Sequence, residues 1–362
     1  MPTKLLVILL LSLLQTTIII PVDCAVVVTG LDSKSRLGDQ LITYAKAKWF
    51  SYSHKIPFLH RPFTNSKNFK LHEKEQFADP HANFENVIKI RHDRPHYTYR
   101  SSTLYKVGMD TYLGGYSLAW GSPSVGHSYH IGLREKLLAD SLFFFADDLY
   151  EKVIENPEFA ALLREMLEPI QPIKIVHPPD DRISIAVHVR TSESYPYDSK
   201  YEVKNQGLRF APEQFYIDQI RNLSHELHNI PLYVFVFTDG LDPVGLTSRL
   251  RSGCNMPNIT FESRSSPIPE QFVLQDLYSM KNFTCLIRSC SYFSGIAQLM
   301  GRHALIIRPA HFVRNDQCIV IDKTDIIIPD FEAKKVYYSS FTQHEPGFLA
   351  NLLSKNIKSI AA

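Results

Sequence analysis

The hydrophobic positions of this chain alternate between short β-branched runs and longer stretches with helical spacing. Residues 25–29 (AVVVT) form the first run, and residues 39–54 then place apolar side chains three to four residues apart. Another short run follows at residues 56–59. This strand–loop–helix–strand order predicts a parallel sheet, in which ligands bind beyond the C-terminal ends of the strands.

The C-terminal half repeats the same order. Strands alternating with helices predict a second doubly wound sheet there. The expected strands are residues 183–189, 232–237, 258–261, 285–287 and 305–308, and the expected helices are residues 212–229, 244–251, 270–280 and 295–300. An amphipathic helix over residues 348–360 is expected to pack against the rest of the protein.

The middle of the chain is less regular. Residues 60–135 are rich in His, Tyr, Arg and Lys without clear periodicity, which fits either ordinary surface loops or a surface for a polar ligand. Residues 135–167 have a helical pattern, and the four prolines within residues 168–181 predict a linker. We therefore expect an α/β protein with domains at residues 25–168 and 183–340, a linker at 169–182 and a C-terminal helical segment at 341–362.

The N-terminus has the pattern of a translocation signal. Lys4 precedes a Leu-rich run at residues 5–20, and Val22 and Cys24 are small enough to allow cleavage before Ala25. An uncleaved membrane anchor and a lipidated Cys24 are the two alternatives. Each of them places the body of the protein outside the cytosol, secreted or in the lumen of the secretory pathway.

Composition bears on three properties of the protein: its partners, its disulfides and its glycosylation. The 362 residues carry 39 basic and 37 acidic side chains, a balance that argues against a nucleic-acid partner. Cys254, Cys285, Cys290 and Cys318 permit disulfides after translocation but equally fit free thiols, and their spacing matches no zinc site. The three glycosylation sequons, at Asn222, Asn258 and Asn282, are about as many as composition alone produces.

Polar and charged residues follow the predicted strands directly. Arg190 leaves the strand at 183–189 just after His188, Asp239 leaves the strand at 232–237, and serines follow the strand at 285–287. Because such strand ends line one crevice, a guanidinium, hydroxyls and a helix N-terminus there can hold a diphosphate without metal. An acidic side chain can accept hydrogen bonds from a base or a ribose. No phosphate-binding glycine loop of the ATPase type occurs.

Several blocks of the sequence resemble the GDP-fucose-dependent fucosyltransferases of the GT-B fold, most closely the α1,2-fucosyltransferases. Residues 35–45 (SRLGDQLITYA) are similar to that family's GRLGNQ…QYA segment, and residues 185–193 (IAVHVRTSE) to its HxRRxD motif. Residues 236–239 (VFTD) are similar to its VFSDD strand end, and residues 276–301 to its last conserved block. The blocks occur in the family's order and span roughly residues 25–310.

The resemblance implies two Rossmann-like domains that face a cleft, an acceptor-side domain first and a nucleotide-sugar-binding domain second. It implies inverting, metal-independent transfer of fucose from GDP-fucose, the donor substrate, to a glycan hydroxyl. The catalytic residues would be Arg190, His188 and Glu193, with Arg190 stabilising the departing GDP. The donor would be held by residues from both domains: Arg36, Gly38, Asp239, Asp276, Ser289, Ser291 and Ser294.

Three positions depart from the family pattern. Thr191 replaces the second arginine, Glu193 replaces the motif's aspartate, and Asp39 stands where the family has asparagine. Glu193 and Asp239 are the candidates for the general base. The loss of one guanidinium leaves open an alternative, a catalytically degenerate GT-B protein that binds a glycan or a nucleotide sugar without transfer.

Overall fold

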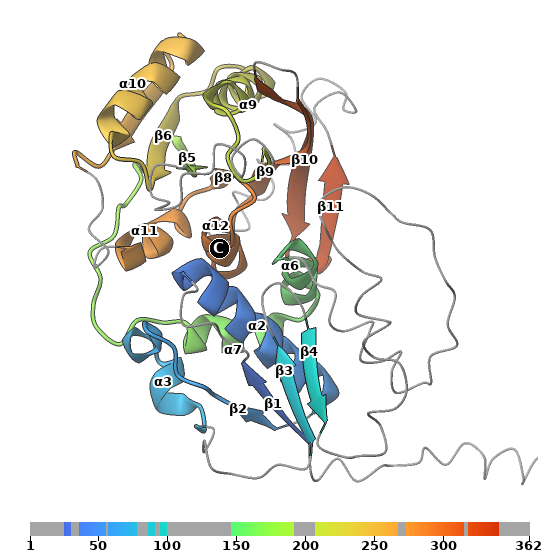
Figure 1. Cartoon of the computed structure of the whole chain (residues 1–362). Coiled ribbons are helices and arrows are strands. Elements are labelled where there is room, and N and C mark those ends of the chain that lie inside the picture. The colour runs from blue at the N-terminus through green and yellow to red at the C-terminus, as the bar shows by residue number, and fades with distance from the viewer. Residues whose placement is uncertain are drawn as a thin grey trace, which may run out of the picture. The chain divides into compact units, whose positions relative to one another are not determined.

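A computed structural model describes residues 25–29, 36–55, 57–77, 86–90, 95–99, 146–191, 207–266, 273–314 and 318–339. The chain divides into two compact units, whose elements are labelled in Figure 1. The smaller unit comprises residues 1–31, 46–62 and 75–143, and the larger one residues 32–45, 63–74 and 144–362. The predicted leader at 1–24 and the predicted helix at 348–360 lie outside the described residues.

The smaller unit is built on a four-stranded sheet. Its strands are β1 (Ala25–Thr29), β2 (Phe58–Leu59), β3 (Asn86–Ile90) and β4 (Pro95–Tyr99), in the spatial order β2-β1-β3-β4. β1 pairs in parallel with β2 and β3, and β4 is antiparallel to β3. Helix α2 (Leu37–His54) connects β1 to β2, as the sequence pattern predicted.

The larger unit is built on a seven-stranded sheet. Its strands are β5 (Ile183–Val189), β6 (Leu232–Thr238), β7 (Ile259–Ser263), β8 (Cys285–Arg288), β9 (Leu305–Arg314), β10 (Ile319–Asp330) and β11 (Lys335–Ser339). Their spatial order is β11-β10-β9-β8-β5-β6-β7. The five strands from β9 to β7 are parallel, and β10 and β11 extend the sheet as antiparallel strands.

Helices cover both faces of this sheet. Figure 1 shows α9 (Glu213–Glu226) and α10 (Pro243–Cys254) on one face and α11 (Val273–Met280) and α12 (Tyr292–Met300) on the other. The core beneath α9 and α10 is made by Val187, Val234, Ile287 and their neighbours, which are almost completely buried. Strands buried on both faces explain why β5, β6 and β8 read as continuous apolar runs in the sequence.

Most predicted elements are confirmed within a few residues, but three stretches differ. The helical pattern at 135–167 becomes two helices in its described part, α6 (Ala146–Glu155) and α7 (Pro157–Met166), because Pro157 cannot donate a backbone hydrogen bond inside a helix. The irregular stretch at 60–135 contains β3 and β4, a 3-10 turn (Ser66–Asn68) and the short helix α3 (Leu71–Lys74). Strands β10 and β11 were not predicted.

The division into units also differs from the predicted one. Residues 146–166, expected in the N-terminal domain, belong to the larger unit, where α6 packs against α12 and β11. Residues 36–45, the start of α2, belong to it as well. Residues 169–182 contain neither helix nor strand, although the backbone N–H of Val176 donates to Ser279 Oγ at 2.9 Å.

The structure also bears on the cysteines and on bilayer-crossing helices, although the expected anchor at residues 1–24 lies outside the described residues. Cys254, Cys285, Cys290 and Cys318 are all free thiols, so the pairing of Cys285 with Cys290 that the sequence permitted does not form. Within the described ranges, no helix combines the length and the apolar character that a bilayer crossing requires.

Candidate functional site

The candidate site lies at the C-terminal edge of the parallel strands in the larger unit. The five parallel strands lie in the spatial order β7-β6-β5-β8-β9. Along the chain the sheet grows from β5 through β6 to β7, and then continues with β8 and β9 on the other side of β5. The winding direction therefore reverses between β5 and β8. Open α/β sheets bind ligands at such a switch point. Arg190 follows β5 and Ser289 follows β8, so the sheet itself brings these two sequence-predicted residues together.

Arg190 and Asp239 form the centre of the site. The Arg190 guanidinium donates to Asp239 Oδ2, and Asp239 Oδ1 accepts from the Thr191 backbone N–H at 2.9 Å and from Thr191 Oγ1 at 3.4 Å. The Arg190 side chain is 10% exposed and that of Asp239 is 23% exposed. The pair is therefore shielded from water and still reachable, which increases the strength of its electrostatic interactions.

The start of α2 adds a second cation. Arg36 Nη1 lies 3.9 Å from Asp239 Oδ2, and the Arg36 side chain is 41% exposed. Two residues later, Gly38 contacts α12 so closely that a Cβ built on it would lie 2.6 Å from the backbone nitrogen of Phe293. Gly38 thus serves as a contact point between two helices, which allows Arg36 to reach the strand ends of the larger sheet.

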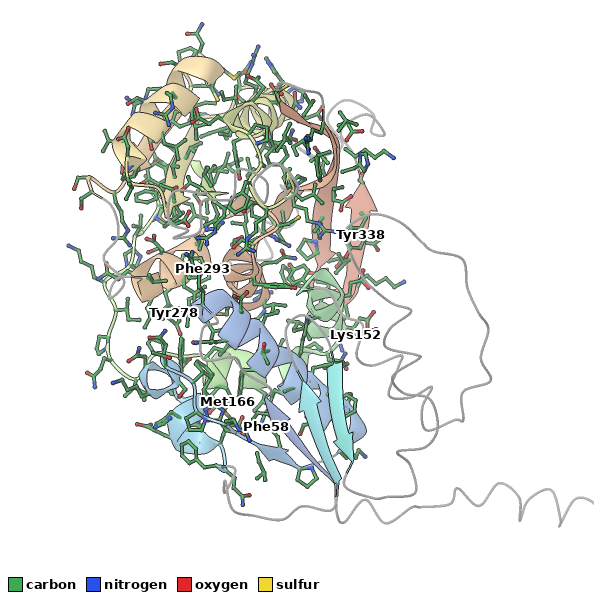
Figure 2. The ribbon with its side chains drawn as sticks, viewed as in Figure 1. Phe58, Lys152, Met166, Tyr278, Phe293 and Tyr338 are labelled. Carbon is green, nitrogen blue, oxygen red and sulfur yellow. The ribbon has the colours of Figure 1, made fainter. Side chains whose placement is uncertain are left out.

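His188 is buried beneath these groups. Its burial, together with the Arg190 and Arg288 guanidinium groups, lowers the pKa of His188 to about 4, although Asp239 acts in the opposite direction. Its ring centroid lies 5.7 Å from that of Phe293, which Figure 2 labels on α12. His188 is therefore neutral at physiological pH, and its Nδ1 has no hydrogen-bond partner within the described part of the chain.

The serine loop, residues 289–291, joins β8 to α12, which begins at Tyr292 rather than at the predicted residue 295, so Ser294 lies in the first turn of the helix. The Ser289 backbone N–H donates to the carbonyl of His188 at 3.4 Å, which ties the loop to β5. Ser291 occupies the N-cap position of α12, and Ser294 Oγ donates to the Ser291 carbonyl at 3.2 Å. Ser289 is completely buried, while Ser291 is half-buried at the helix start, where backbone N–H groups favour an anion.

Two further residues complete the site, and sequence reasoning did not assign them a place there. Arg288 is buried, and it donates to Gln298 Oε1 at 2.7 Å and to the Ser289 carbonyl at 3.1 Å, which holds the serine loop against α12. Tyr216 of α9 is completely buried, and burial raises its pKa, while Ser289 and the Arg190 backbone act in the opposite direction. The clue to Arg288 was a charged residue at the end of an otherwise apolar strand, whereas Tyr216 has no local signal.

Asp276 lies in the first turn of α11 and pairs with Arg264, the residue that follows β7. Arg264 Nε donates to Asp276 Oδ1 at 2.6 Å, and the Asp276 side chain is only 4% exposed. Burial raises the pKa of Asp276 to about 6 against the opposing effect of Arg264. Both Asp276 and Asp239 therefore already accept from arginine.

Glu193 lies outside the described residues, so the structure does not place the predicted general base. Asp39, which replaces the family's asparagine, is in the first turn of α2, where its backbone carbonyl accepts from Thr43 Oγ1 at 2.7 Å. The described residues contain no group of three or more His, Cys, Asp or Glu side chains that could hold a metal ion.

Comparison with known proteins gives low similarity. No protein-family model matches the chain, and no curated protein matches it. Among solved structures, it is similar to fucosyltransferase NodZ from Bradyrhizobium, with 14% identity and a TM-score of 0.39 over 84% of this chain and 99% of that one. It is also similar to a mutant of Arabidopsis thaliana FUT1 in complex with GDP, with 14% identity and a TM-score of 0.41 over 79% of this chain and 71% of that one.

A third solved structure is the heptosyltransferase WaaC of E. coli, with 10% identity and a TM-score of 0.29 over 77% of this chain and 87% of that one. At these identities and TM-scores, the likeness assigns no residue a role.

Proposed function

We propose that the chain is a GT-B glycosyltransferase that transfers fucose from GDP-fucose to a glycan hydroxyl with inversion. The observation that carries the proposal is that Arg190 leaves β5, the strand beside which the winding direction of the larger sheet reverses, and that its guanidinium binds Asp239 at the end of the neighbouring strand β6. The sequence blocks around Arg36, Arg190, Asp239 and the serine loop support the choice of donor through their resemblance to the GDP-fucose-dependent enzymes, and all of them belong to the larger unit.

The chemistry of fucosyl transfer explains why such a group is needed. Breaking the bond between the sugar and the diphosphate leaves negative charge on the departing GDP. A guanidinium fixed before the reaction stabilises this growing charge more than it stabilises the bound substrate, and loss of one such donor costs about 10²–10³ in rate. Arg190 suits this role because its side chain is only 10% exposed and because it directly follows the end of β5.

The remaining residues have supporting roles in the proposal. Arg36 supplies the second positive charge, since Thr191 stands where the family has an arginine. The start of α12, with Ser291, faces a phosphate, and the paired Asp276 and Arg264 border the nucleoside. His188 stays neutral and donates or accepts a hydrogen bond. Glu193 is the candidate base that receives the acceptor's proton in a single displacement.

A second candidate is the degenerate reading, a protein that binds the nucleotide sugar or a glycan without transfer. Thr191 favours it, and so does the engagement of Arg190 by Asp239.

The body of the chain would act beyond the cytosol, with residues 1–24 as a cleaved signal or a single membrane anchor.

The test is transfer by the purified full chain. With GDP-fucose and a panel of glycan acceptors, mass spectrometry should detect a fucosylated product, and Arg190→Ala should reduce its rate by about 10²–10³. Arg249→Ala is the control, because Arg249 lies on the exposed side of α10, where it pairs with Glu213. GDP binding without product would favour the degenerate protein, and the absence of both would reject the donor site.

A further inference from the structure

We propose that Asp239 is a positioning residue, which holds the Arg190 guanidinium and the Thr191 backbone in place for a diphosphate. In naming the diphosphate this inference rests on the proposed function. It differs from the sequence-based expectation, in which the Asp239 carboxylate touches the nucleotide or removes a proton from the acceptor.

The contacts of Asp239 account for both of its oxygens. Oδ2 accepts from Arg190 and faces Arg36 Nη1 at 3.9 Å. Oδ1 accepts from the Thr191 N–H at 2.9 Å and lies 3.4 Å from Thr191 Oγ1. An ionised carboxylate offers about four lone-pair sites; three protein donors hydrogen-bond to this one, and Arg36 Nη1 lies 3.9 Å away as an ion pair. The carboxylate is therefore committed to protein groups, so it is poorly placed to bind a ribose or to act as a base.

The anchoring of Asp239 suits it to hold other groups. It directly follows β6, which is buried along its whole length and pairs with β5 up to Thr238 and Val189. The Gly240 N–H donates to Thr238 Oγ1 at 3.0 Å, which fixes the turn that carries Asp239. Arg190, by contrast, is a long side chain with many rotamers, and its preorganisation requires a fixed partner.

This arrangement also explains what a threonine contributes at position 191. A threonine at this position presents a hydroxyl and a backbone N–H to the same carboxylate oxygen. With Arg36 and Arg190 positive and Asp239 negative, the three groups retain one excess positive charge. The cluster therefore still attracts a diphosphate, while the carboxylate sets where the guanidinium points.

The first test separates a positioning role from direct contact with the nucleoside. Calorimetry of Asp239→Asn with GDP and with guanosine should show GDP binding weakened about tenfold or more and guanosine binding unchanged. In an Arg190→Gln background, Asp239→Asn should cause a smaller loss of GDP affinity than in the unaltered chain, because the Arg190 contact is already gone and only the Thr191 contacts remain to be lost. Equal weakening for GDP and guanosine, or additive losses, would overturn the proposal.

Two variants serve as controls. Asp239→Glu keeps the charge and should recover part of the GDP affinity that Asp239→Asn loses; no recovery would count against positioning through charge. Asp325→Asn breaks a comparable pair, with Arg308 at 2.8 Å, on β10, three strands and roughly 14 Å from β5. GDP affinity should not change in that variant, and a loss as large as that of Asp239→Asn would indicate a general structural effect.

A ligand-free measurement keeps this inference separate from the proposed function. Urea unfolding of Asp239→Asn, Arg190→Gln and the double variant should show non-additive shifts of the midpoint. Additive shifts would overturn the holding role. If the unaltered chain binds neither GDP nor guanosine, the proposed function fails, and the unfolding cycle still decides whether Asp239 holds Arg190.

Discussion

At the scale of single residues, the site depends on contacts that leave little room for change. Gly38 illustrates this, because the backbone of α12 occupies the space where a side chain would begin: a Cβ there would lie 2.6 Å from Phe293 N and 2.9 Å from Phe293 Cα. Backbone atoms cannot move aside as the end of a side chain can. The glycine of the RLG segment is therefore explained by close approach of two helices.

Replacing Gly38 with alanine should separate the starts of α2 and α12. We expect Gly38→Ala to lower the free energy of unfolding by about 1–3 kcal/mol, the usual cost of overpacking. GDP affinity should fall as well, because Arg36 moves with α2. Urea unfolding and calorimetry measure the two effects.

Gly253→Ala is the matched control for this prediction. In α10 the three atoms nearest to the added Cβ all belong to the Ile217 side chain, with Cδ1 at 2.4 Å, and a side chain can move aside more readily than backbone. Alanine is also favoured over glycine in a helix by up to about 1 kcal/mol. Equal destabilisation by the two substitutions would contradict the role assigned to Gly38.

At the scale of elements, helix and strand ends decide which groups are available. Asp242 caps α10 by accepting from the Gly245 N–H at 2.8 Å, and Asn255 ends that helix in the left-handed conformation with φ 51°. Both signals are local and readable in the sequence. The three glycosylation sequons share the pattern Asn-x-Ser/Thr, but they lie on different structural elements and so have different surroundings.

When the full chain is expressed in secreting eukaryotic cells, we expect a glycan on Asn282 and none on Asn258. Asn282 is exposed in the turn between α11 and β8, at the opposite end of β8 from the site. Asn258 Nδ2 donates to Ser224 Oγ at 3.0 Å and to the Ile230 carbonyl at 3.2 Å, so a glycan there would cost a hydrogen bond. Peptide mapping by mass spectrometry checks the prediction, and occupancy of Asn258 in folded protein would contradict it.

At the scale of the whole molecule, buried histidines make stability depend on pH. Burial lowers the pKa of both His188 and His303 to about 4, from an ordinary value of 6.5. Between these two values the unfolded chain binds protons that the folded chain excludes. The stability from each neutral histidine is therefore present above pH 6.5 and is lost as the pH falls toward 4.

Asp276 acts in the opposite direction, since its pKa is raised to about 6 and the folded state binds its proton first. With two histidines against one aspartate, the free energy of unfolding should fall by on the order of 3 kcal/mol between pH 6.5 and pH 4. Urea unfolding across this range measures the slope. His303→Gln should reduce the slope, and an unchanged slope would show that His303 is not the group that titrates.

Much of the fold could be predicted because the relevant signals are local. The strands that became β5, β6 and β8 are runs of apolar residues that only a doubly covered sheet can bury, and turn residues mark their ends. The exact position of Arg190 and Asp239 just after these strands followed from the same signals. Strands β10 and β11 were missed because β11 and the first half of β10 are exposed or half-buried, and because β10 leads into another strand rather than into a helix of the βα pattern used for the prediction.

The amino-acid sequence by itself determined the α/β class, the positions of the parallel strands and the polar residues at their ends, since hydrophobic periodicity and turn chemistry are properties of neighbouring residues. Only the tertiary structure decided that β8 lies beside β5, that Asp239 binds Arg190 and Thr191, and that the start of α2 belongs with the larger sheet. These contacts join residues far apart in the chain, and they arise from the packing of whole elements, which no local pattern records.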